Sequence, residues 1–245
     1  MSPSKTARSQ QSGFSLIELL LVVVILFVMT GMVFAMMKSA LARSGTEQAK
    51  LDMFQAGREF MDQMSRDLHQ AGYPNPQNFA PGTLAYPPAN DHRASVGVVK
   101  VDTGDLWFEG DMDGSGTVSV IHYHLDTSTT NGCPCLKRSW QVKSDGDPLT
   151  GQATPVYQVE VQGVQDLNIF SAYVGGATGT PIGLPVDFTS NAATMATIDT
   201  VRAVLTIRST YVDPETHENP ITTLITSVRL NNCSQAKVGL PMSCR

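Results

Sequence analysis

A short acidic stretch in the middle of the chain has the residue types and spacing of a calcium-binding loop. Calcium takes oxygen ligands, and loops of this kind turn sharply at a glycine, the position that Gly116 holds. The candidate ligands occupy alternate positions of the stretch GDMDGSGTV: Asp111, Asp113, Ser115 and Thr117, the last through its backbone carbonyl. The position that should supply a bidentate glutamate holds His122 instead.

A tight turn between two strands is the alternative interpretation of the same stretch. Asp-Gly and Ser-Gly are turn formers in their own right, because glycine adopts positive φ without strain and Asp and Ser bond to the backbone that follows. The sequence leaves both interpretations open. Apart from calcium, we expect no cofactor.

Two histidines lie two positions apart just beyond the acidic stretch. On a strand, His122 and His124 face the same side, since side chains alternate. Two histidines on one face can ligate a metal, although histidines exposed on a strand are more often unliganded.

The chain has four cysteines, Cys133, Cys135, Cys233 and Cys244. An even number beyond an apolar segment fits disulfides in an exported domain, with reduced thiols as the alternative. Cys233 and Cys244 bracket a short loop and are the favoured pair. A bridge across Cys133-Pro134-Cys135 would need strain, so other connectivities stay open. A zinc site is disfavoured, because Cys-Pro-Cys lacks the spacing of a zinc knuckle.

Motifs of catalysis and of nucleic-acid binding are absent from the sequence. It contains no Gly-x-Ser-x-Gly elbow, His-Glu-x-x-His, phosphate-binding loop or dinucleotide fingerprint. The 245 residues carry a formal net charge of −5 without a basic cluster, which argues against a nucleic-acid partner. We therefore predict that the protein is not an enzyme and does not bind nucleic acid.

The acidic stretch, the two histidines and the first two cysteines lie in a region that is predicted to form β-strands. Alternation through Val118, Val120, His122 and His124 favours a half-buried antiparallel strand. A stretch of low charge, Ser171–Thr197, is expected to be a long surface loop. The predicted strands are Ser95–Val101, Leu106–Glu109, Thr117–Leu125, Leu136–Val142, Val156–Phe170, Thr200–Tyr211 and Ile221–Leu230.

A long apolar run near the amino terminus carries a single charge. From Phe14 to Met37 only Glu18 is charged, and the run exceeds the roughly 20 residues that cross a bilayer as a helix. A basic leader, with Lys5 and Arg8, predicts that the amino end stays inside and that the remainder is exported. A cleaved secretory signal would need a shorter core and a better cleavage site. A plain signal anchor explains the length but not Glu18, because a carboxylate at membrane depth is costly.

The motif Gly-Phe-Ser-Leu-Ile-Glu-Leu-Leu, residues 13–20, resembles the class III signal of type IV prepilins and type II secretion pseudopilins. The resemblance implies that a prepilin peptidase removes residues 1–13 by cutting between Gly13 and Phe14, and then methylates the amine of Phe14. It also makes Glu18 the fifth residue of the mature chain, the position of the family's key glutamate.

This resemblance agrees with the electrostatics. Cleavage exposes a positively charged α-amine on Phe14, and Glu18 lies one helical turn away as an i,i+4 neighbour. The carboxylate can pair with this amine or with the amine of an adjacent subunit, and an intermolecular pair would also fix the register of packed helices.

Helical periodicity continues beyond the apolar run. Apolar residues recur every three or four positions from Met53 to Ala71, and Gly72-Tyr73-Pro74 ends the pattern. We expect one helix over 14–73, of which 14–37 is transmembrane, with weak points at Gly31 and Gly45, followed by a β-rich head over 74–245. The predicted fold class is therefore α+β with a pilin-like helix packed on an antiparallel sheet.

Two further motifs refine the resemblance. Arg-x-Leu-x-x-Ala-Gly-Tyr, residues 66–73, and the ending 227–233 are similar to PilW-type minor pilins, whereas Arg-Asp-Leu-x-Gln also resembles the minor pseudopilin J of type II secretion. The resemblance implies partners (prepilin peptidase and other pilins) and a place in the bacterial inner membrane, with a periplasmic head, before an extracellular filament. PilW-type minor pilin is the favoured interpretation. A tip adhesin that uses Ser171–Thr197 and a membrane-anchored enzyme are the alternatives.

Overall fold

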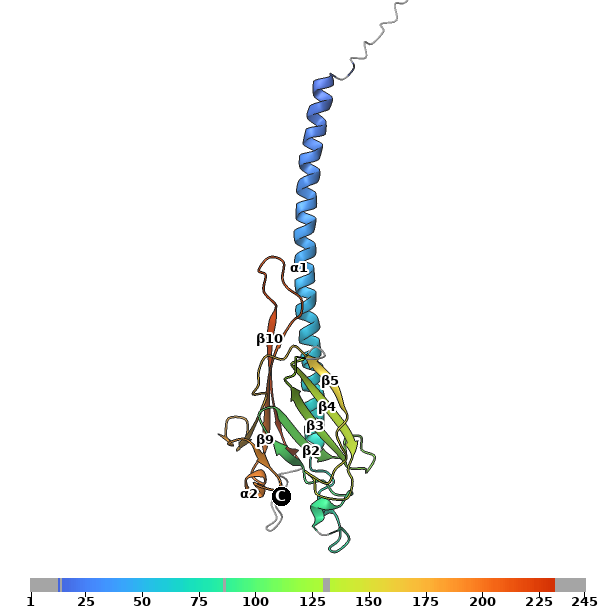
Figure 1. The fold of residues 1–245 in the computed structure, drawn as a ribbon, viewed down its shortest axis with the longest axis vertical. Helices are drawn as coiled ribbons and strands as arrows, with labels where there is room; N and C mark the ends of the chain where they lie inside the picture. Colours follow the sequence, from blue (N-terminus) through green and yellow to red (C-terminus); the bar gives the residue numbers. More distant parts are fainter. Residues whose placement is uncertain (1–12, 14, 86, 130–132, 232–245) are drawn as a thin grey trace, which may run out of the picture.

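A computed structural model describes residues 13, 15–85, 87–129 and 133–231. A single long helix, α1 (Leu16–Gln70), carries a β-rich head at its carboxyl-terminal end (Figure 1). With 55 residues, α1 is about 80 Å long at 1.5 Å per residue. It continues through Gly31 and Gly45 without interruption, so neither glycine breaks it. The predicted α+β architecture, with one apolar amino-terminal helix and antiparallel sheets, is confirmed.

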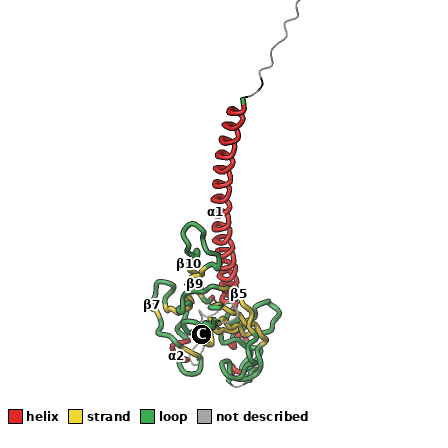
Figure 2. The backbone as a smooth tube through the Cα atoms, turned by 45° about the horizontal axis from the view of Figure 1, so that its top comes forward, coloured by secondary structure: helices red, strands yellow, loops and turns green. Residues whose placement is uncertain are grey.

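The two halves of α1 have different surroundings. The first half projects from the head as a free rod, as Figure 2 shows. The second half packs on the head through the apolar residues that recur every three or four positions from Met53 to Ala71. Side chains with this spacing share one face of a helix. The buried members of this half are Thr46, Met53, Gly57, Phe60, Met61, Met64, Asp67 and Leu68.

The described part of the head contains two antiparallel sheets. The larger has the strand order β5-β4-β3-β2-β1-β8, and the smaller has the order β10-β9-β6-β7. The strands of the larger sheet are β1 (Val98–Val101), β2 (Asp105–Gly110), β3 (Ser119–Asp126), β4 (Cys135–Val142), β5 (Tyr157–Gln162) and β8 (Val186–Asp187). Those of the smaller sheet are β6 (Phe170–Val174), β7 (Thr180–Pro181), β9 (Thr200–Arg208) and β10 (Ile221–Arg229). Among the residues that the structure describes, the connections contain the short helices η1 (Pro76–Asn78), η2 (Pro88–Asn90) and α2 (Ala192–Met195).

The main core lies where α1 meets both sheets. Helix α1 contacts β10, β9, β5 and β2, so that it spans the two sheets. The ring of Phe60 from α1 meets that of Tyr123 from β3 edge to face, with 5.3 Å between centroids. Gly57 allows α1 to approach β10 closely, since a Cβ there would lie 2.3 Å from Leu224 Cδ1. A second, smaller cluster around Ala89, Val96 and Val99 also packs against Trp107.

The prediction of one strand over Val156–Phe170 is wrong. This segment supplies β5 to the larger sheet and the first residue of β6 to the smaller sheet. The chain turns at Gly163, which has φ 73° and lies so close to Arg208 that a Cβ would meet the carbonyl oxygen of Arg208 at 2.3 Å. The apolar residues continue through this turn, so that Gly163 is the local signal that marks it.

The prediction of a long surface loop over Ser171–Thr197 is also wrong in part. The segment contains most of β6, the two-residue strands β7 and β8, and α2. Val186 pairs with Val101 of β1, and Met195 is buried in the main core. Two-residue strands have no periodicity of their own, so the sequence could not reveal them.

Candidate functional site

The first turns of α1 form the candidate functional site. Glu18 lies in the first turn, where its backbone N–H donates to the carbonyl of Ser15 at 3.0 Å. It is the only acidic residue among apolar side chains that are exposed on every face of the helix; Leu16, for example, is 83% exposed and Phe27 is 70% exposed. Exposed apolar surface on this scale is unfavourable in water. By length and composition, this part of α1 is able to cross a membrane.

Gly13, immediately before the helix, is exposed and unpacked. A Cβ at Gly13 would have no heavy atom within 4 Å. The fold of this chain therefore does not require a glycine there. A requirement for glycine at this position would have to come from outside the chain, as in recognition by a peptidase. Phe14 lies outside the described residues.

The sequence around this site matches a known motif. Residues 8–34 match the prokaryotic N-terminal methylation motif. They form a prepilin-type signal. The match covers Gly13, Phe14, Glu18 and much of the exposed half of α1, and it supports a type IV pilin-like protein. Comparison with curated proteins and with solved structures found no match. Pilin-like proteins are in general structural and not enzymatic.

The prepilin-type signal and the apolar helix together indicate a membrane-anchored, pilin-like chain.

The junction between α1 and the head determines the orientation of the head relative to the helix. The motif at residues 66–73 forms this junction. Leu68 and Ala71 are fully buried, and the N–H of Gly72 donates to the carbonyl of Glu109 at 3.0 Å. Ala71 also forms an isolated bridge with Gly110, where a Cβ would meet the carbonyl oxygen of Gln70 at 2.4 Å.

A buried polar network fastens α1 to the larger sheet at the same junction. Asp67 is only 4% exposed, and its Oδ2 accepts hydrogen bonds from Tyr123 Oη at 2.8 Å and from Arg138 Nε at 3.0 Å. Gln63 Nε2 donates to the other carboxylate oxygen at 2.6 Å. Burial, and then the neighbouring Asp67 carboxylate, raise the pKa of Tyr123 well above its ordinary value. The phenol therefore stays protonated and acts as the donor.

We did not predict this network from the sequence. One signal was available: Asp67 follows Met64 by three positions and so falls on the buried apolar stripe, where a carboxylate needs a partner. The identity of the partners, Tyr123 and Arg138, could not be inferred, because they lie far along the chain on β3 and β4.

The connection between β9 and β10, residues 209–220, runs beside α1 between the head and the apolar half (Figure 1). Arg43 Nε lies 3.3 Å from Glu215 Oε1, and Gly45 allows a close approach, since a Cβ there would be 2.7 Å from Tyr211 Oη. The ion pair is largely exposed and contributes little stability. The close contact with Tyr211 accounts for Gly45, where the sequence predicted a weak point of the helix.

The acidic stretch at residues 110–118 forms a compact loop after β2. Asp111 Oδ2 accepts from the N–H of Gly116 at 2.9 Å, and Asp113 Oδ1 accepts from the N–H of Ser115 at 3.0 Å. Both Gly114 (φ 70°) and Gly116 (φ 83°) need the freedom of glycine. Asp111 is 3% exposed, and its Oδ1 has no hydrogen-bond partner among the described residues. His122 does not contribute to this loop, because it bonds to Asp105 instead.

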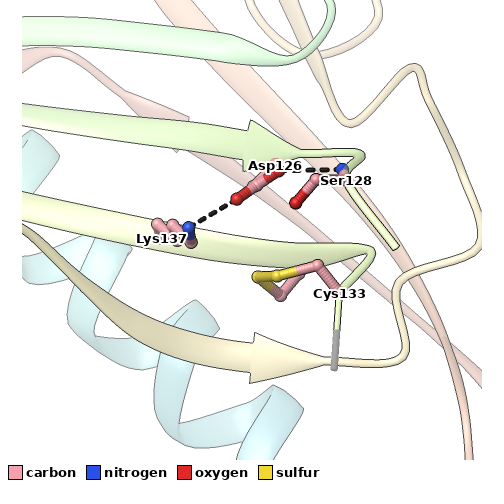
Figure 3. The surroundings of a disulfide bond; sticks show 5 residues. Asp126, Ser128, Cys133 and Lys137 are labelled. Carbon is pink, nitrogen blue, oxygen red and sulfur yellow. Dashed lines mark hydrogen bonds and ion pairs between the residues drawn. A yellow bond between two sulfur atoms is a disulfide. The ribbon is translucent and has the colours of Figure 1, made fainter. Parts of the chain in front are cut away.

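Cys133, just before β4, and Cys135, the first residue of β4, form a disulfide (Figure 3). Their Cα atoms are 4.4 Å apart, which a disulfide can span although one residue separates them. From the sequence we expected a bridge between these two cysteines only with strain, and the connectivity was left open. Beside it, Asp126 pairs with Lys137 across the two strands and accepts from the N–H of Ser128 at 2.8 Å. The favoured pair, Cys233 and Cys244, lies outside the described residues and stays a prediction.

Proposed function

We propose that this chain is a minor pilin that takes part in the assembly or priming of a type IV pilus through α1. The observation that carries the proposal is the exposed apolar half of α1, with Glu18 in its first turn and a prepilin-type signal around it. A surface of this kind is covered by lipid before assembly and by neighbouring pilin helices in a filament. The function is therefore structural, and we assign no catalytic residue.

The proposal gives Glu18 a partner. Cleavage between Gly13 and Phe14 leaves an α-amine one turn from the carboxylate, and pairing the two charges reduces the cost of burying each. A pair between adjacent subunits would also specify the axial register of the filament. The partners implied are the prepilin peptidase, the inner membrane and other pilins. The head would be periplasmic before assembly and extracellular in the filament.

The junction motif favours a PilW-type minor pilin over the minor pseudopilin J of type II secretion. Its Leu68, Ala71 and Gly72 fasten the end of α1 to β2, so this resemblance rests on residues that position the head. A tip adhesin is another alternative, and the partly exposed turn at 175–179 would then contact the target. Deletion of this turn should leave attachment unchanged if the chain only assembles filaments, and should abolish attachment if it is an adhesin.

Intact-mass measurement of the chain extracted from membranes tests the proposal. We expect the loss of residues 1–13 and the gain of one methyl group on Phe14. Gly13→Val should prevent cleavage, whereas Gly31→Ala is a matched control, because a Cβ at either glycine meets no atom within 4 Å. A mature protein that keeps Met1 would overturn the proposal and favour a simple membrane anchor.

We further propose that the loop formed by residues 111–117 binds calcium. The observation in favour is the buried and unpartnered Oδ1 of Asp111, since a buried carboxylate oxygen needs a proton, a donor or a cation. Asp113, Ser115 and the carbonyl of Thr117 would complete the ligand set. Because the bidentate glutamate is missing, we expect affinity in the range of extracellular modules, roughly 10⁻⁴–10⁻³ M.

Calorimetric titration of the full chain in detergent tests the calcium site. We expect heat of binding and a rise in Tm at millimolar calcium, both lost in Asp111→Asn. Asp62→Asn, an exposed site on α1, is the control. The absence of both signals in the unmodified chain would leave the stretch as a turn.

A further inference from the structure

Three metal-ligating side chains converge on the face of the larger sheet that points away from α1. Asp105 Oδ1 lies 2.9 Å from His122 Nε2 and 2.7 Å from His124 Nδ1. All three ligand atoms lie within 4.8 Å of one another. His122 is nearly buried, with its side chain 11% exposed, whereas the side chain of His124 is 38% exposed. The cluster is therefore anchored in the sheet and open to solvent on one side.

The register of β2 and β3 creates this cluster. Asp105 is directly opposite His124, and Trp107 is directly opposite His122. Side chains two apart on a strand share a face, so His122 and His124 flank the same carboxylate. The intervening Tyr123 points to the opposite face, where it bonds to Asp67. Rigid strands therefore hold all three side chains of the cluster.

We propose that Asp105, His122 and His124 bind a divalent transition metal, of which Zn²⁺ is the expected one. Two imidazole nitrogens and one carboxylate oxygen are ligands that Zn²⁺ accepts, and three protein ligands leave a fourth position for water or for a ligand from outside the chain. Calcium is disfavoured here because it prefers oxygen ligands. The site is separate from the loop formed by residues 111–117 and from the helix that carries the proposed assembly function.

The groups around His122 fix its orientation. Tyr157 Oη lies 2.7 Å from His122 Nδ1, and the indole of Trp107 stacks on the imidazole with 4.7 Å between centroids and 8° between planes. A hydrogen bond to one ring nitrogen sets the tautomer of a ligating histidine and directs the other nitrogen to the metal. Tyr157 therefore acts as a positioning residue that turns Nε2 toward Asp105.

The distances need only a small adjustment to admit a metal. With bonds of roughly 2.0–2.2 Å, the ligand atoms of a tetrahedral zinc lie about 3.4 Å apart. The two distances from Asp105 Oδ1, 2.9 Å and 2.7 Å, are shorter than this by roughly 0.5–0.7 Å, as hydrogen bonds require, and the two histidine nitrogens lie within 4.8 Å of each other. Lys100 Nζ lies 3.8 Å from the other carboxylate oxygen, Oδ2, so that Oδ1 remains directed at the two histidines.

A hydrogen-bonded network without a metal is the competing arrangement. In it both imidazoles donate N–H groups to Asp105, and Tyr157 donates to His122. The two arrangements differ in measurable ways: only a metal site takes up Zn²⁺ in a fixed ratio, gives a Co²⁺ absorption spectrum and loses both when one ligand is removed.

Zinc titration of the full chain in detergent, purified through a tag without histidine and first treated with a chelator, tests the proposal. We expect one Zn²⁺ per chain, an increase in Tm and visible absorption with Co²⁺. His124→Ala removes a partly exposed ligand, and Asp105→Asn preserves shape; each should weaken zinc binding by at least tenfold. Tyr157→Phe should weaken it by about 10–100-fold, as expected for a partner that orients a ligand.

Two control variants locate the site. His92→Ala removes the histidine of the other histidine-containing cluster, with Asp91 and Asp145, and should leave zinc binding unchanged. Asp111→Asn should abolish calcium binding without affecting zinc. The proposal is overturned if the chelated chain binds no zinc, if His124→Ala binds as tightly as the unmodified chain, or if His92→Ala is the variant that loses the metal. The Tm of each chelated variant is measured first, so that loss of binding is separated from loss of folding.

Discussion

Tyr123 Oη donates a 2.8 Å hydrogen bond to Asp67 Oδ2 and so joins strand β3 to helix α1 inside the head. The same carboxylate oxygen lies 2.8 Å from Arg138 Nη2 on β4. Contacts such as these determine the orientation of the head relative to α1. The network fixes α1 in one rotational and axial position, because a shift of one residue would remove the carboxylate from both partners.

Replacement of Asp67 by leucine should destabilise the head by roughly 3 kcal/mol, because the buried Tyr123 hydroxyl and Arg138, whose side chain is 14% exposed, both lose their carboxylate partner. Denaturant unfolding of the full chain measures the effect. Asp62→Leu is the matched control: Asp62 is exposed on the same helix, 3.8 Å from Arg58, and its loss should cost less than about 1 kcal/mol. Equal stability of the two variants would show that the network does not hold the helix.

Lys143 and Glu109 form an ion pair that is fully buried, with 2.8 Å between Nζ and Oε2. Lys143 Nζ also donates to the carbonyls of Ala89 and Ala94, so all three of its N–H groups are bonded. Lys143→Met should therefore cost roughly 3–5 kcal/mol, because it leaves the buried Glu109 carboxylate without a counter-charge.

Burial raises the pKa of Glu109, and the Lys143 ammonium opposes this shift. Addition of Glu109→Gln to Lys143→Met should therefore restore part of the lost stability by removing the unpaired charge. Thermal unfolding of the two variants gives the comparison. A double variant less stable than Lys143→Met would contradict this explanation.

Acid should destabilise the head partly through Asp91. This carboxylate accepts from the N–H of Ala85 at 2.8 Å and from Arg93 Nη2 at 2.7 Å. The hydrogen bond from Arg93 holds the pKa of Asp91 well below its ordinary value, although burial opposes the shift. Because the folded pKa lies below the unfolded one, the stabilisation is present above the unfolded value of about 3.9 and is lost as the pH falls below it.

Asp91→Asn should therefore reduce the decline of unfolding free energy with acid below about pH 4, and Arg93→Met should act in the same direction. Unfolding curves measured over a series of pH values give the slopes. A slope that is the same in Asp91→Asn as in the unmodified chain would mean that the acid sensitivity arises elsewhere.

Glu18→Ala should spare cleavage after Gly13 but impair either methylation of Phe14 or incorporation into filaments. The expected cause is the loss of the counter-charge for the α-amine. Mass measurement reports cleavage and methylation, and the fraction of the chain in sheared filaments reports incorporation. Glu47→Ala, an exposed acid further along α1 that pairs with Lys50, is the control. Normal methylation and incorporation of Glu18→Ala would show that the carboxylate is dispensable.

The sequence by itself determined the elements whose signal is local. The apolar run and Glu18 predicted α1 and the prepilin-type signal. Both signals can be recognised from the sequence because each consists of residues that are neighbours in the chain. Alternation predicted strands that overlap β3, β9 and β10, and the glycines at 114 and 116 predicted a turn. These features depend on neighbours within about one helical turn or a few strand positions.

Only the tertiary structure decided which distant residues meet. It showed that Asp67 is buried against Tyr123 and Arg138, that Asp105 lies between His122 and His124, and that the segment 171–197 completes both sheets. The physical reason is common to all three. The stability of a buried charge, a ligand cluster or a two-residue strand depends on partners far away in the chain, and their positions are fixed only when α1 and the two sheets pack together.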